Sequence, residues 1–171
     1  MNVADLGLLF EYNQWANSRI LQQALRLTPK QLSTPRKVSH GSAFQGLLHL
    51  VDVEWSWRQA CQTGLFPTEI LSEVQLPDLK VLRRFWLAEM GEMSAYIRSL
   101  SESQVNAPVR YSWARARPRE KTLWHVLAHL VNHGTQHRAE LGGYLAQCGH
   151  APGDLDFILF VSKRPAGDHA Q

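Results

Sequence analysis

Four histidines recur at a fixed interval near the end of the chain, and this interval could support metal chemistry. They are His125, His129, His133 and His137, each four residues from the next. Residues four apart lie one above the other on a helix, close enough for two imidazoles to share one metal ion. Each step of four drifts by about 40° around the helix, so all four rings cannot face the same ion.

The helical wheel of this segment separates the four histidines into two groups. His133 and His137 fall inside the apolar stripe, His129 falls at its border, and His125 lies outside it. The stripe is made by Val126, Leu130, Leu141 and Tyr144. Two buried imidazoles are costly unless something satisfies them. A metal ion would satisfy them, as would hydrogen bonds to side chains or water, and the spacing leaves both open. Any third metal ligand must come from elsewhere in the chain.

The histidines need other elements to hold them, and the apolar periodicity predicts four long amphipathic helices. Their expected ranges are about 3–27, 43–62, 79–100 and 123–147. Segment 101–121 is expected to be non-helical, with 107–113 as one arm of a small hairpin, and a short helix is expected after Asp154. Four helices with long connectors predict an all-α four-helix bundle with some parallel neighbours. We expect one domain over residues 1–163 and a flexible tail over 164–171.

Several polar residues interrupt or border the predicted apolar stripes. Asn13 and Asn17 interrupt the first helix, which predicts either a surface edge or a polar bond between helices. His49 lies on the polar face of the second helix, which would either line a site or meet water. Glu54 falls near the apolar face of that helix, so we expect an arginine or backbone partner, because an unpaired buried carboxylate is expensive.

Composition limits the classes of protein that this chain can belong to. The 171 residues, 44% of them apolar and with a net charge of +3, predict a folded domain with a core. Cys61 and Cys148 are too few for a disulfide framework. No signal peptide or membrane-length apolar run is evident, so we expect a soluble cytoplasmic protein without a membrane partner. Arg115, Arg117 and Arg119 form a basic tip that favours a solvated loop over nucleic-acid contact.

Two histidine-bearing segments resemble the DinB/YfiT-like family. The stretch His129-Leu-Val-Asn132-His133-Gly-Thr-Gln-His137-Arg138 resembles that family's signature helix, whose pattern is close to His-x-x-Asn-His-x-x-x-His-Arg. The second helix resembles the family's at Gly41, Ser42, His49, Glu54 and Trp57, and the first at residues 12–17. The resemblance covers about residues 3–162.

The resemblance implies an up-down-down-up four-helix bundle, often a homodimer, with one divalent metal ion held by three histidines. On this sequence the ligands would be His49, His133 and His137, and the ion zinc, nickel, iron or manganese. The chain departs from the family pattern at Gln136, where an aromatic residue or histidine is common, and at Glu140, where many members have glutamine. Glu140 is a candidate catalytic residue. It would act as a base, a fourth ligand or an acceptor for an imidazole N–H, or else lie on the surface.

Three neutral imidazoles leave at least one coordination position open, which is typical of catalytic metal sites. Such a position can activate a thiol for attack on an electrophile, or activate water for hydrolysis. Relatives in the wider superfamily resemble the first class, as thiol S-transferases and a mycothiol-dependent isomerase. The expected partners are therefore a small-molecule thiol and an electrophilic substrate. The rival hypothesis is a non-enzymatic, dimeric stress-response or binding module with a structural metal. DNA binding is the weakest alternative.

Overall fold

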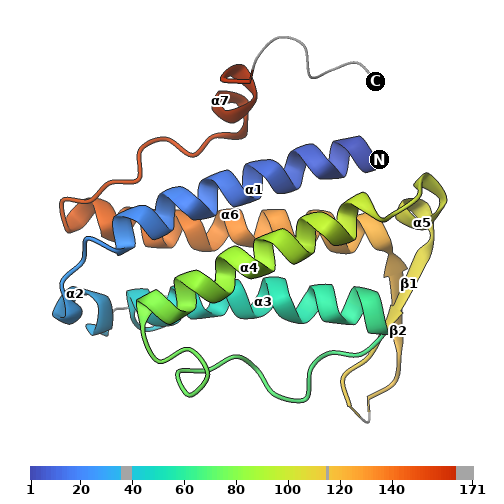
Figure 1. Ribbon diagram of the computed structural model, residues 1–171, viewed down its shortest axis with the longest axis horizontal. Coiled ribbons are helices and arrows are strands. Elements are labelled where there is room, and N and C mark those ends of the chain that lie inside the picture. The colour runs from blue at the N-terminus through green and yellow to red at the C-terminus, as the bar shows by residue number, and fades with distance from the viewer. Residues whose placement is uncertain (36–39, 115, 165–171) are drawn as a thin grey trace.

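Four long helices lie side by side and form a bundle (Figure 1). The structure is a computed structural model, and it describes residues 1–35, 40–114 and 116–164. They are α1 (Val3–Ala24), α3 (Ala43–Thr63), α4 (Leu79–Arg98) and α6 (Leu123–Gln147). Connector 64–78 returns along the bundle, so α3 and α4 run in the same direction, opposite to α1 and α6 (Figure 1). The expected up-down-down-up bundle is confirmed.

The apolar stripes of the helices meet in the interior. Helix α6 packs against α1 and α3, and α4 packs against the same two helices from the other side. Leu6, Leu47 and Leu127 are fully buried, as is the indole of Trp86. Among the described residues, no helix is long and apolar enough to cross a membrane.

Local capping chemistry fixes where the helices begin and end. The hydroxyl of Ser42 accepts a hydrogen bond from the backbone N–H of Gln45, and the Gln45 side chain accepts one from the Ser42 backbone N–H. Asp78 caps α4 in the same position. Gly64 ends α3 with φ of 79°, a left-handed conformation that glycine adopts without steric cost. These caps agree with the expected boundaries.

The connectors hold smaller elements, two of which the sequence pattern does not predict. Strands β1 (Pro108–Tyr111) and β2 (Arg119–Thr122) form the expected antiparallel hairpin, and α7 (Phe157–Ser162) is the expected short helix. Helices α2 (Pro29–Ser33) and α5 (Glu102–Asn106) were not expected, and α5 shows that assigning all of 101–121 as non-helical was wrong. Each begins with a capping box, at Thr28 and Ser101. The predicted tail from residue 165 onward and Arg115 of the basic tip lie outside the described residues.

Candidate metal centre

Imidazole rings from α3 and α6 lie close together between these helices. His49 extends from α3 toward His133 and His137 of α6, with ring centroids 5.0 Å and 4.8 Å away. The rings of His133 and His137 are 4.4 Å apart. Atoms Nε2 of His49 and Nε2 of His133 are separated by 3.2 Å. The structure therefore brings together the three histidines singled out as candidate ligands.

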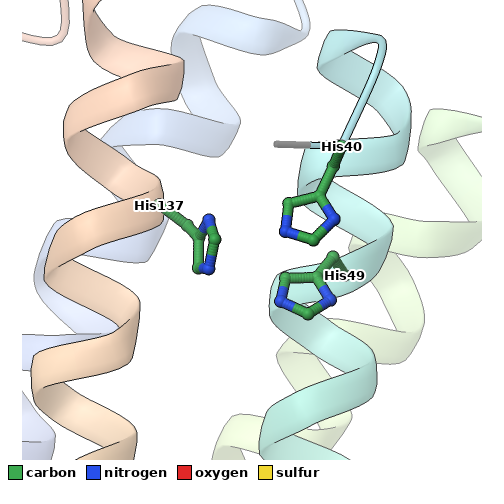
Figure 2. Close-up of side chains that lie close together, drawn as sticks. All are labelled: His40, His49 and His137. Carbon is green, nitrogen blue, oxygen red and sulfur yellow. The ribbon is translucent and has the colours of Figure 1, made fainter. Parts of the chain in front are cut away.

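A fourth imidazole, His40, joins this group from the segment just before α3. Its ring stacks on that of His49, with centroids 3.7 Å apart and planes inclined by 20° (Figure 2). The ring of His137 faces both from α6, with its centroid 4.8 Å from that of His40. One possible ligand atom from each of His40, His49 and His137 lies within 4.8 Å of the others. Sequence reasoning missed His40, because a residue outside a helix has no periodicity to reveal which face it shares.

The environment of the cluster keeps the imidazoles of His49 and His133 neutral at physiological pH. Burial, followed by the neighbouring imidazoles, lowers the pKa of His49 to about 4. Burial and the ring of His137 lower the pKa of His133 to about 4 as well. Burial also lowers the pKa of His40, opposed by the carboxylate of Glu140. Neutral rings present nitrogen lone pairs, the form in which histidine binds metal.

The arrangement fits a divalent cation. Two nitrogen ligands at zinc distances on a tetrahedral ion are about 3.3 Å apart, close to the 3.2 Å between the Nε2 atoms of His49 and His133. The buried Nδ1 atom of His137 makes no hydrogen bond with any described residue. It lies 3.5 Å from Oε2 of Glu140, within range of electrostatic attraction although the contact is not a hydrogen bond. A metal ion bound through Nε2 would turn Nδ1 into an N–H donor facing this carboxylate.

The remaining histidines of α6 stay outside the cluster, in agreement with the wheel. His129 is exposed, with its ring centroid 5.7 Å from that of His133 and 5.8 Å from that of Trp57. His125 is exposed and contacts Trp124. The four-residue spacing thus places one end of the histidine series between α3 and α6 and the other end in solvent.

A buried polar network fixes α6 against α1 and α3 beside the cluster. The carboxylate of Glu54 accepts hydrogen bonds from the amides of Asn13 (2.6 Å) and Asn17 (2.8 Å), and from the indole of Trp86 (2.7 Å). The Arg138 guanidinium donates to the carbonyl oxygens of the same two asparagines, at 2.5 Å and 2.9 Å. The prediction that Glu54 pairs with an arginine or a backbone group was wrong. Its hydrogen-bond partners are side-chain amides and an indole, and the two asparagines bridge it to Arg138. Of the two interpretations of Asn13 and Asn17, the polar bond between helices is confirmed.

Gly134 makes room for this network within the histidine helix. A Cβ atom at this position would lie 2.6 Å from Nη1 of Arg138 and 2.9 Å from Oδ1 of Asn13. Arg138 is 1% exposed, so its guanidinium has no free volume into which to retreat. The glycine between His133 and His137 therefore allows the arginine to reach the asparagines.

Comparisons with known proteins agree with the fold and with the family resemblance of the sequence. The chain is 27% identical over 175 residues to Protein DinB of Bacillus subtilis (strain 168), covering 91% of this chain and 94% of that protein. The crystal structure of a DinB-like protein from Bacillus subtilis superposes with a TM-score of 0.61 at 14% identity, covering 84% of this chain and 92% of that one. The family model described as DinB family matches residues 1–167. The chain therefore belongs to the DinB family.

Proposed function

We propose that this protein binds one divalent metal ion through His49, His133 and His137 and uses it in an enzyme reaction of the thiol S-transferase type. The observation that carries the proposal is the convergence of neutral imidazoles from two helices, with one nitrogen pair already 3.2 Å apart. Three neutral ligands leave the double positive charge of the ion uncompensated and part of its coordination sphere open. Zinc, nickel, iron and manganese all suit this donor set.

The chain's own groups supply the remaining parts of such a reaction. A bound metal ion supplies a Lewis acid that lowers the pKa of a thiol. We propose Glu140, whose carboxylate is 32% exposed and lies 3.5 Å from Nδ1 of His137, as the acceptor of the proton that the thiol loses. The sulfur then forms a bond to an electrophilic carbon, and the leaving group departs with the electrons of the bond that breaks. With water as the nucleophile, the same groups would serve a hydrolase.

One observation favours the alternative of a structural metal. His40 supplies a fourth imidazole beside the other three, and four protein ligands are typical of closed structural zinc sites. In that case the ion would tie α3 to α6 without offering a position to substrate, and the protein would be a binding or stress-response module. A homodimer is expected under either hypothesis, and sedimentation equilibrium would test it.

Metal content tests the proposal directly. Protein purified without chelator should contain close to one divalent ion per chain, and His137→Ala should lose most of it. His125→Ala is the matched control on the same helix and should retain the ion, because this ring is exposed and outside the cluster. A wild-type protein that contains no metal and takes none up on dialysis would rule out both hypotheses.

The catalytic part needs a separate test. Thiol consumption should be measured with a small thiol and an electrophile such as 1-chloro-2,4-dinitrobenzene, comparing wild type with Glu140→Gln. We expect a metal-dependent rate that falls about 100-fold in the variant if Glu140 accepts the proton. A metal-loaded protein whose cobalt spectrum is unchanged by small thiols would favour the structural role instead.

A further inference from the structure

His40 differs from the other three clustered histidines in how it is held. His49, His133 and His137 are fixed by helices whose apolar faces are packed in the core. His40 lies outside the helix, two residues before the Ser42 cap, and Gly41 between them has φ of 71°. Its ring position is therefore set by side-chain torsions and by the stack on His49, not by helix packing.

The distances place His40 within reach of the proposed ion, although its present contact is a ring stack. A possible ligand atom of His40 lies within 4.8 Å of those of His49 and His137. Ligands of one tetrahedral ion are about 3.3 Å apart, so bringing these three atoms to ligand spacing needs shifts of at most about 1–2 Å, which side-chain rotation can supply. His133, by contrast, is already at ligand spacing from His49.

We propose that His40 is an exchangeable fourth ligand, which completes the coordination of the ion held by the other three histidines and is displaced when a small anionic ligand binds. The inference rests on the proposed metal site and specifies how its open position is controlled. A closed four-imidazole site and an open three-imidazole site then become two states of one centre. Incoming ligands must compete with His40, so weak metal donors such as carboxylates would need high concentrations to bind, whereas strong donors such as thiolates would still bind.

The competition has a measurable size. If His40 is bound to the ion in about nine molecules of ten, only about one tenth of the molecules can bind an incoming ligand. The apparent dissociation constant of that ligand is then about tenfold higher. Removing the imidazole removes this competition. Metal affinity should fall less than on loss of His137, because three helix-borne ligands remain.

The test uses cobalt-loaded full-length protein and azide as the probe. His40→Ala removes the ring, whereas His40→Phe keeps an aromatic ring to stack on His49 and lacks a donor nitrogen. His125→Ala is the control, and circular dichroism checks that each variant is folded. We expect both His40 variants to bind cobalt, to show a shifted visible spectrum and to bind azide about tenfold more tightly than wild type. Added imidazole should return the spectrum of His40→Ala toward that of wild type.

Three outcomes would overturn the inference. Spectra and azide affinities equal to wild type in both variants would make His40 a neighbour and not a ligand. A shifted spectrum with unchanged azide affinity would make it a permanent ligand. Failure of the wild type to take up cobalt in equilibrium dialysis would remove the proposed function as well, and this measurement on the wild type distinguishes the two failures.

Discussion

Replacing Gly134 by alanine tests the buried network beside the histidines, because the structure predicts the opposite of the usual effect. In a helix interior, alanine in place of glycine normally stabilises by about 0.5–1 kcal/mol. Gly143 lies on the same helix, and a Cβ added to it would meet none of the described residues within 4 Å. Gly143→Ala should therefore show the usual gain in stability. At Gly134 the new methyl group would lie 2.6 Å from the Arg138 guanidinium.

The expected cost follows from what Arg138 would have to give up. Moving the guanidinium breaks one or both of its bonds to Asn13 and Asn17, and hydrogen bonds to a charged group contribute about 1.5–3 kcal/mol each. After the usual alanine gain is subtracted, Gly134→Ala should lower the free energy of unfolding by about 0.5–5.5 kcal/mol, depending on whether one or both bonds are lost.

Urea unfolding in the presence of chelator would measure the difference in free energy of unfolding between each variant and the wild type, without a contribution from metal binding. With an m value of about 2 kcal/mol/M, the midpoint should fall by about 0.3–2.8 M for Gly134→Ala and rise by about 0.3–0.5 M for Gly143→Ala. In an Arg138→Met background, Gly134→Ala should destabilise less, because the 2.6 Å clash is removed and only the 2.9 Å contact with Oδ1 of Asn13 remains. The reasoning fails if Gly134→Ala stabilises the otherwise unaltered protein as Gly143→Ala does.

Three further outcomes are expected. Zinc at about 100 times its dissociation constant should raise the free energy of unfolding by about 2.7 kcal/mol, and His137→Ala should abolish this gain in a thermal shift assay. Metal-free protein should lose stability as pH falls from 6.5 to about 4, because the lowered pKa values of His49 and His133 leave the unfolded state binding more protons in this window. Urea unfolding at stepped pH checks this, and a flat profile would contradict it. Burial raises the pKa of Cys61 to about 12, which leaves little reactive thiolate. In the Cys148→Ser variant, where Cys61 is the remaining cysteine, native protein at pH 8 should react with a disulfide reagent on the order of a hundredfold more slowly than unfolded protein. Equal rates would contradict this.

The long helices were predictable because their signal is periodic. Apolar residues recur every three or four positions along all four, and residues such as Ser42, Asp78 and Gly64 set their limits to within a few positions. The wheel alone placed His133 and His137 on the buried side of α6. The choice of His49 depended on the family resemblance, because its own wheel position fitted a water-facing surface equally well.

The missed features depend on tertiary packing or on very short elements. His40 has no helical period, and only the fold brings its ring onto His49. The Ser101-to-Gln104 capping box was present in the sequence, but a five-residue helix carries too few apolar positions to show a period. Glu54 was expected to meet an arginine or a backbone group. Its asparagine partners belong to α1, so only the packing of α1 beside α3 reveals them.

The polar network and the histidine cluster are physically connected through consecutive residues of one helix. His137 and Arg138 differ by about 100° in direction, so His137 faces the cluster while Arg138 reaches the asparagines of α1. At a radius of about 5–6 Å, a rotation of α6 by about 10° would displace the ring of His137 by about 1 Å, roughly twice the tolerance of a metal or catalytic site. Apolar side chains resist such rotation only through shape, whereas the bonds of Arg138 to two asparagines have a fixed direction. The geometry of the histidines therefore depends on the buried charge beside them.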